Sequence, residues 1–406
     1  MSGLRLSEVE QAHVRQLRIL SVIAYILTVL LVYLASFLPL FDASPHLLVD
    51  KDSLASPLLR WDAFHFGSYA VAGRYVYEHQ WAFFPGVSIV MKTFGSLIHH
   101  LCGLVGYEQT PTLTWSTLLL GGATACLLTS TTTTLYKLTL LYTRSPSIAY
   151  LTALLSLVPT SPVTLRLVPY SEPFVAYFSY TGMYFCATSE WFWAATFFTF
   201  ASAFRSNGFL LGGFLLWGLL VEPMLQRKKI PITQALKAIL YTALPFIPFI
   251  HHEVSAYLAF CAPTSAPTLA PWCTNFPPSI YTYVQGKYWN VGFLRYWTLA
   301  QIPNFVIAAP VLALLVWYTG THIRRVAIPQ FLAYFDAPPP HSNPNPKLNP
   351  QTSPLLSPTL TPHAIHALLT TLIYIFASHT QIVLRQAAAL PTTYWAAAYL
   401  VVEKPG

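Results

Sequence analysis

Charge is what this sequence has least of. Only 9% of its 406 residues are Asp, Glu, Lys or Arg, while 54% are hydrophobic. A soluble domain carries about 25% charged residues, so a water-soluble fold could not cover its surface with so few ionisable groups. Several apolar runs are also longer than the roughly 18 residues that cross a bilayer. The sequence therefore predicts an all-α polytopic membrane protein.

Other absences narrow the function. The five cysteines form no C-x-x-C pair, so the sequence has neither a zinc nor a redox signature. It shows no internal repeat, which counts against transporter folds built from duplicated halves. The net charge of +8 comes from basic residues near the ends of apolar runs. That placement favours orientation in a membrane over nucleic-acid binding.

Charges beside the apolar runs predict the topology. Arginines precede the first run and acids follow it, so we expect a retained anchor, a cytosolic N-terminus and a first loop, 42–82, on the far side. With Arg227-Lys228-Lys229 and Arg324-Arg325 cytosolic, the count works only if 83–104 lies flat or re-enters the membrane without crossing it. The ten predicted spans are about 19–41, 112–136, 148–168, 172–188, 191–204, 207–222, 233–260, 293–318, 362–380 and 387–402.

Two further segments stand apart from the spans. A second large loop on the far side, 261–292, holds Cys261 and Cys273, the only cysteines that this topology places in an oxidising compartment, so they are candidates for a disulfide. Segment 338–362 contains nine prolines. Proline at that density disfavours a helix, and we expect an extended cytosolic linker there.

Asp62 in the first loop is the acid with the most unusual neighbours. An exposed acid on a loop is ordinarily a solvated turn residue. Here Arg60, Trp61 and His65 lie beside it, and several more aromatic residues follow in the same loop. Aromatic side chains of this kind suit a loop that lies on a bilayer or closes over a sugar. The sequence therefore favours a functional carboxylate.

The topology collects most other ionisable groups of the apolar regions on the same side as Asp62. An ionisable group at membrane depth is costly unless it is paired or hydrated, so each is a functional candidate. The alternative is that these residues extend singly from helix ends to the interface. Glu172 could orient a sugar hydroxyl or pair with Arg166. The group comprises Glu78, Arg166, Glu172, Arg205, His251, His252, Glu253, His379 and Arg385.

Six stretches, in order from residue 60 to residue 395, resemble the GPI mannosyltransferase 2 family, also called the PIG-V family. The resemblance implies a single transmembrane glycosyltransferase domain, 1–406, of GT-C type, with a long first luminal loop that carries the catalytic acid. The matching stretches are Arg60-Trp61-Asp62-Ala63-Phe64-His65-Phe66, Ala82-Phe83-Phe84-Pro85-Gly86, Tyr170-Ser171-Glu172, Arg205-Ser206-Asn207-Gly208, Trp272-Cys273 through Phe305, and His379-Thr380-Gln381 with Arg385 and Pro391.

The same resemblance implies a reaction and its setting. The family transfers the second mannose of the GPI anchor, α1,6-linked, from dolichyl-phosphate-mannose to the GPI precursor lipid at the luminal face of the endoplasmic reticulum membrane. Some fungal members are thought to need a small accessory membrane subunit, so such a partner is an expectation here. Candidate substrate-binding residues around the catalytic Asp62 are Arg60, Trp61, His65, Glu78, Glu172, Arg205, Asn207, Gln285, Trp289, His379, Gln381 and Arg385.

The expected chemistry needs one base and a partner for an anion. Asp62 would take the proton of the acceptor 6-hydroxyl in a single inverting displacement. Arg385, His379 and Arg205 would meet the leaving lipid phosphate. The donor has one phosphate and no D-x-D pair lies near Asp62, so we predict no metal and no cofactor. Three alternatives remain: another dolichyl-phosphate-sugar transferase, a lipid or solute transporter, and a non-catalytic scaffold subunit.

Overall fold

A computed structural model describes residues 6–39, 44–106, 110–262, 269–336 and 353–403, and all regular structure in these ranges is helical. The main helices are α1 (Glu8–Ala35), α2 (Asp62–Ala72), α3 (Gly86–Leu104), α4 (Trp115–Leu127), α5 (Thr132–Thr143), α6 (Pro146–Leu155), α7 (Pro162–Arg166), α8 (Ser171–Ala187), α9 (Trp191–Phe204), α10 (Gly212–Leu216), α11 (Glu222–Leu225), α12 (Ile232–Ala243), α13 (Ile247–Phe260), α14 (Ile280–Trp289), α15 (Ile302–His322), α16 (Ile328–Asp336), α17 (Thr361–Phe376), α18 (Val383–Gln386) and α19 (Pro391–Glu403).

Seven helical stretches of the described chain are long and apolar enough to cross a membrane, which confirms a polytopic membrane protein. Four predicted spans correspond to helices that are shorter than a full crossing. They are 148–168, which holds α6 with 10 residues and α7 with 5, and 172–188, 191–204 and 387–402, which correspond to α8, α9 and α19 with 17, 14 and 13 residues. The seven stretches are Glu8–Ala35, Gly86–Leu104, Trp115–Thr143, Ser206–Leu225, Ile232–Phe260, Leu299–Asp336 and Pro358–Phe376.

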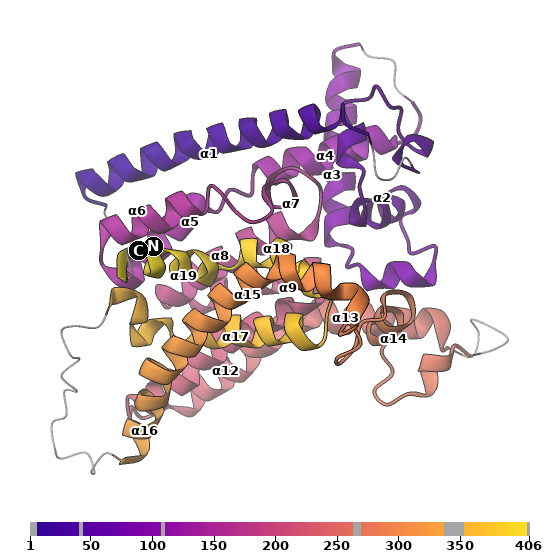
Figure 1. Cartoon of the computed structure of the whole chain (residues 1–406). Helices are drawn as coiled ribbons and strands as arrows, with labels where there is room; N and C mark the ends of the chain where they lie inside the picture. Colours follow the sequence, from indigo (N-terminus) through magenta and orange to yellow (C-terminus); the bar gives the residue numbers. More distant parts are fainter. Residues whose placement is uncertain (1–5, 40–43, 107–109, 263–268, 337–352, 404–406) are drawn as a thin grey trace.

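The longest single helix, α1, lies along one side of the helical bundle (Figure 1). Figure 1 also shows α2, α3 and α14 at one end of the bundle, and both chain termini with α16 at the other. Most of the apolar side chains of α1 are exposed, among them Ile26, Leu30 and Leu34. Exposed leucine and isoleucine on a long helix are expected where the solvent is lipid.

Helix α3 corresponds to most of the segment that the sequence predicts not to cross. Figure 1 shows α3 running across the direction of α1, as a segment flat in the membrane would. Its 19 residues are also long and apolar enough to cross. The flat or re-entrant placement of 83–104 stays a prediction.

Two apolar cores hold the bundle together. The larger one joins α5, α8, α9, α10 and α19 around Tyr180, Phe198 and Trp395, which are fully buried. The second joins α2, α3, α4 and the start of α8. Within it, a Cβ atom at residue 67 would overlap the indole of Trp115, so only glycine lets α2 pack this closely on α4. This second core fixes α2, and with it Asp62, against the bundle.

The predicted proline-rich linker is only partly within the described residues. Positions 338–352 lie outside them, whereas 353–362 form two 3₁₀ helices, Pro354–Leu356 and Pro358–Leu360, and begin α17. Leu355, Leu356 and Leu360 are buried in the larger core, and Tyr318 donates a hydrogen bond of 2.6 Å to the Leu355 carbonyl. For this last part the prediction of an extended linker is wrong, because proline suits the first turn of a helix and the leucines between the prolines pack inward.

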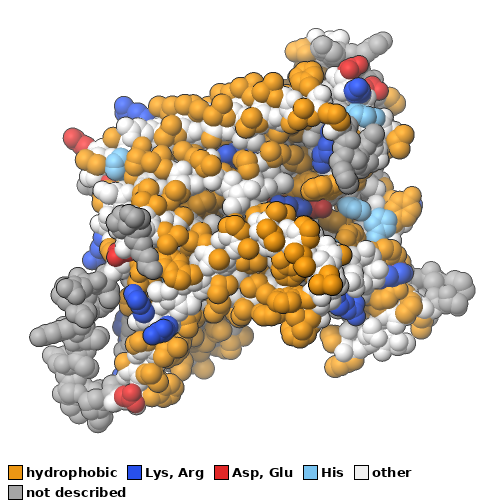
Figure 2. Space-filling view, viewed as in Figure 1, with side chains coloured by type: hydrophobic (Ala, Val, Ile, Leu, Met, Phe, Trp, Pro, Cys, Tyr) orange, Lys and Arg blue, Asp and Glu red, His pale blue; other side chains and the backbone are white. Residues whose placement is uncertain are grey.

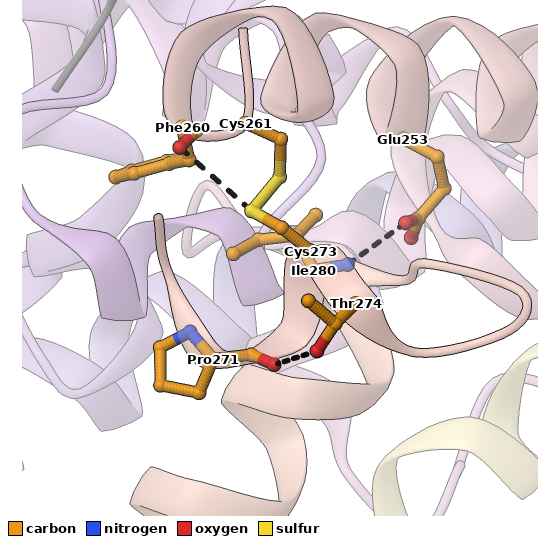
Figure 3. The surroundings of a disulfide bond; sticks show 7 residues. All are labelled: Glu253, Phe260, Cys261, Pro271, Cys273, Thr274 and Ile280. Atoms are coloured by element: carbon orange, nitrogen blue, oxygen red, sulfur yellow. Dashed lines mark hydrogen bonds between the residues drawn. A yellow bond between two sulfur atoms is a disulfide. The ribbon is translucent and has the colours of Figure 1, made fainter. Parts of the chain in front are cut away.

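The second large loop is anchored at both ends. Figure 3 shows the disulfide between Cys261 and Cys273, whose Cα atoms are 5.5 Å apart, and the carboxylate of Glu253 beside the start of α14. Glu253 accepts hydrogen bonds from the backbone nitrogens of Ile280 at 2.9 Å and Tyr281 at 3.2 Å. These bonds satisfy donors that every helix leaves open at its N-terminus. Glu253 therefore fixes α14 to α13.

Replacing both Cys261 and Cys273 by serine should lower the free energy of unfolding by about 2–3 kcal/mol, because the bond closes a loop of a dozen residues. The midpoint of thermal unfolding of the purified protein measures the change. Cys102→Ser, which alters an exposed free cysteine, is the matched control. An unchanged midpoint in the double variant would show that the loop needs no covalent closure.

Candidate active site

Asp62 is the first residue of α2, and the chain turns sharply to bring it there. Trp61, just before it, has φ of 39°, a backbone conformation that side-chain-bearing residues rarely adopt, and its indole is 68% exposed. The preceding Leu58 and Leu59 are buried and anchor the turn. Carboxylates are favoured in the first turn of a helix because the helix dipole is positive there.

Three other charged residues occupy helix ends that suit their charge. Glu172 lies in the first turn of α8, Arg205 follows the last residue of α9, and Arg385 lies on the short helix α18. An acid at a helix N-terminus and a base at a helix C-terminus are both favoured by the helix dipole. These ends meet at Asp62, so residues 323 positions apart in the sequence become neighbours.

The four side chains form one chain of ion pairs. Arg385 Nη2 donates to Asp62 Oδ2 at 2.7 Å and lies 2.9 Å from Glu172 Oε1. Arg205 Nη1 reaches the same Glu172 oxygen at 3.2 Å and donates to Ser171 Oγ at 2.9 Å. Figure 2 shows basic, acidic and histidine side chains close together in a recess bordered by hydrophobic side chains. The sequence predicted this convergence, and the structure shows it for these four residues.

The exposed fraction of the side chain differs sharply among these ion-paired residues. The Glu172 side chain is 1% exposed, Arg385 16% and Asp62 28%. Burial alone would lower the pKa of Arg385, but the carboxylates of Glu172 and Asp62 outweigh it and raise that pKa. Glu172 is thus the buried counter-charge of two arginines, while Asp62 is the carboxylate that a ligand can reach.

Several contacts of the site involve residues that the sequence analysis did not single out. The Tyr170 ring lies 4.5 Å from the Arg385 guanidinium carbon, and its hydroxyl donates to the Arg60 carbonyl at 2.9 Å. The Gln386 side chain lies between Arg205 and Tyr374, and in the amide orientation that suits Arg205 its oxygen is 3.0 Å from Nε. Tyr170 belongs to the stretch Tyr170-Ser171-Glu172, one of those that indicate the family. For Gln386, the only indication in the sequence is its position next to Arg385.

A small cavity extends behind the ion pairs into the bundle. Its volume is about 40 Å³, enough for water, which needs roughly 10–15 Å³ by the same measure. Asn207, a predicted site residue, lies on its wall, with its side-chain amide 3.3 Å from the side-chain amide of Gln386. The other polar lining comes from Glu172, Ser179, Arg205, His366, Thr370, Tyr374 and Gln386.

Aromatic rings from α2, α14 and the segment between α2 and α3 pack together one helical turn from Asp62. His65, one turn along α2, stacks on Phe83 with ring centres 4.2 Å apart and meets Trp289 edge-on at 6.2 Å. Burial, and then the neighbouring His79, lower the pKa of His65 to about 4. His65 is therefore neutral at neutral pH.

Other predicted site residues make hydrogen bonds that hold the loops around the site. Glu78 accepts from Lys287 Nζ and from the Tyr288 hydroxyl, each at 2.6 Å, and the bond to Glu78 raises the pKa of Lys287. Arg60 donates to the carbonyls of Ser56 and Leu59 at 3.0 and 2.7 Å. Gln285 is half-buried on α14. The contacts of Glu78 join the first loop to α14, and those of Arg60 hold the turn before α2.

His379 and Gln381 form a second group beside α15. His379 Nε2 lies 2.6 Å from the Trp289 carbonyl oxygen, and its ring stacks on Tyr296 with centres 4.7 Å apart. The Tyr296 hydroxyl donates to Gln381. This group ties the α17–α18 turn to the second large loop.

The pairing of Glu172 with Arg166, one alternative from the sequence, does not occur. Arg166 donates to the carbonyls of Ser156 and Leu157 at 3.3 and 2.6 Å, beyond the end of α6. Carbonyls at a helix end lack partners, and a cation there is favoured by the helix dipole. Glu172 pairs with Arg205 and Arg385 in its place.

Comparison with known proteins identifies the family. The family model described as Mannosyltransferase (PIG-V) matches residues 13–405. The chain is 33% identical to a GPI mannosyltransferase 2 of Cryptococcus neoformans, with 90% of this chain and 83% of the relative aligned. It is 30% and 29% identical to the GPI alpha-1,6-mannosyltransferases 2 of Rattus norvegicus and Homo sapiens, each over 87% of this chain and 75% of the relative. No solved structure matches. The chain belongs to the PIG-V family of mannosyltransferases.

Proposed function

We propose that this enzyme transfers mannose from dolichyl-phosphate-mannose to the 6-hydroxyl of the first mannose of the GPI precursor, at the luminal face of the endoplasmic reticulum membrane. Relatives that cover most of the chain are named GPI alpha-1,6-mannosyltransferase 2. The observation that carries the proposal is the chain of ion pairs in which the accessible Asp62 adjoins Arg385.

Asp62 acts as the general base in this proposal. It accepts the proton of the acceptor hydroxyl while the hydroxyl oxygen attacks C1 of the donor mannose. The bond from C1 to the lipid phosphate breaks on the opposite face, so the configuration at C1 inverts in one step. A carboxylate that is partly exposed beside a half-buried cationic group suits this role.

The two arginines stabilise the leaving phosphate. Cations that are already oriented where negative charge develops lower the barrier without rearranging during the reaction. Arg385 and Arg205 share the buried Glu172, which fixes their positions before substrate arrives. The rings of His65, Phe83 and Trp289 would pack against acceptor sugar. Among the described residues, no three His, Cys, Asp or Glu side chains are grouped to hold a metal ion, and metal independence stays a prediction.

Reconstituted transfer tests the substrate pair. The purified enzyme in vesicles, given dolichyl-phosphate-mannose and GPI precursor with one mannose, should yield a product with two mannoses joined by an α1,6 bond. A precursor with no mannose and an N-glycan precursor serve as acceptor controls. Transfer to either control, with none to the singly mannosylated GPI lipid, would overturn the acceptor assignment. The need for a small accessory membrane subunit is tested in the same assay by adding membranes that contain it.

A further inference from the structure

Arg385 is shared between two carboxylates of unequal accessibility. Its Nη2 atom makes both contacts, at 2.7 Å to Asp62 and 2.9 Å to Glu172. Glu172 is 1% exposed, and Arg205 binds the same oxygen of it, so this side of the guanidinium is fixed. Asp62 is 28% exposed at the start of α2. The contact with Asp62 is therefore the one that a ligand can displace.

One hydrogen-bond donor of the same guanidinium has no partner. Arg385 Nε is buried and has no hydrogen-bond partner. A buried donor without an acceptor costs free energy, and an anionic oxygen placed there would recover it. The Tyr170 ring against the guanidinium and the contact with Glu172 would hold Arg385 in place after Asp62 leaves it. An anionic ligand could therefore replace Asp62 at Arg385 while the guanidinium stays in position.

We propose that the Asp62–Arg385 ion pair is a latch on the catalytic base, which the donor phosphate opens. This inference rests on the proposed function. While Oδ2 of Asp62 accepts from Arg385, that oxygen is engaged and Nη2 of the guanidinium is occupied by the two carboxylates. The donor phosphate displaces Asp62 from Arg385, and the freed carboxylate then receives the acceptor hydroxyl. Donor binding therefore precedes productive acceptor binding, and the two bind cooperatively.

Charge balance through the reaction agrees with this exchange. Before reaction the donor phosphodiester carries one negative charge and Asp62 another. The O–H bond of the acceptor breaks and its proton goes to Asp62, which becomes neutral. The C1–O bond to phosphate breaks and leaves its electron pair on the phosphate, which gains one negative charge. The total is unchanged, and Arg385 faces more charge on the phosphate just as Asp62 loses its own. Release of the lipid phosphate and of the Asp62 proton restores the latch.

The latch predicts that removing the base strengthens phosphate binding. Asp62→Asn should bind a short-chain polyprenyl phosphate about tenfold or more tightly than the wild type, because the phosphate no longer competes with a charge-assisted bond to Arg385. Calorimetric titration of the purified full chain measures the dissociation constants. Asp52→Asn removes an exposed carboxylate from the same loop and is the charge-matched control, with no expected change. The polyprenol without phosphate should show no gain, and inorganic phosphate should show the same relative gain at weaker affinity.

A double-mutant cycle separates the latch from a general charge effect. In an Arg385→Gln background the gain from Asp62→Asn should vanish, and the equally uncharged Arg385→Met takes its place if that protein does not fold. A gain that persists without Arg385, or no gain in Asp62→Asn, overturns the latch. Transfer activity reports on the proposed function separately. A variant that loses transfer without gaining phosphate affinity leaves Asp62 as the base and removes the latch, whereas one that keeps transfer removes Asp62 from catalysis.

Discussion

Asp62→Asn should lower the rate of mannosyl transfer by about 100- to 10,000-fold, the usual contribution of a general base. Asparagine keeps the size of the side chain but cannot take up the proton of the acceptor hydroxyl. Folding should survive the change. Arg385 retains its contact with the buried Glu172, and α2 is held by the second core through Gly67.

Transfer of radiolabelled mannose by purified protein at saturating donor measures this effect, with the midpoint of thermal unfolding as a check on folding. Asp52→Asn, in the same loop, should transfer at the wild-type rate. Asp62→Glu should recover part of the lost rate, since it restores a carboxylate at a shifted position. Near-normal transfer by Asp62→Asn would mean that another group, or the leaving phosphate itself, takes the proton.

Composition and residue order were enough to predict the class of fold and the family. Low charge and long apolar runs indicate a helical membrane protein whatever the packing, and the ordered stretches from Arg60 to Pro391 indicate the PIG-V family. The convergence of Asp62, Glu172, Arg205 and Arg385 followed from a simple rule. Ionisable residues next to apolar runs are tolerated where they meet one another.

Pairing within that group could not be predicted. Glu172 lies six residues from Arg166 in the sequence, yet it pairs with Arg205 and Arg385, because α7 turns Arg166 toward the carbonyls beyond α6. The proline content of residues 353–362 predicts a linker, yet their leucines are buried in the larger core. Hydrophobicity averaged over a segment does not show which side of a short helix has a partner.

Glu172→Gln should destabilise the protein by about 3 kcal/mol, at the lower end of the cost of breaking a buried ion pair. The carboxylate is 1% exposed and balances two guanidiniums. Its loss leaves Arg385 paired with Asp62 and removes the carboxylate that Arg205 contacts. Glutamine still offers one acceptor oxygen, which limits the cost. Thermal unfolding of the purified protein measures the change, and Glu190→Gln, on the exposed α8–α9 turn, is the control.

A second substitution distinguishes charge imbalance from simple loss of packing. If the cost of Glu172→Gln comes from unbalanced positive charge, adding Arg205→Gln should restore part of the lost stability, because the double variant has one buried cation fewer to balance. Transfer should stay low in both, since Arg385 no longer has the fixed partner that positions it for phosphate. A double variant that is less stable than Glu172→Gln by the full cost of Arg205→Gln would mean that the two residues contribute independently. The cluster would then be a set of separate contacts, and Glu172 would not act as the common counter-charge of both arginines.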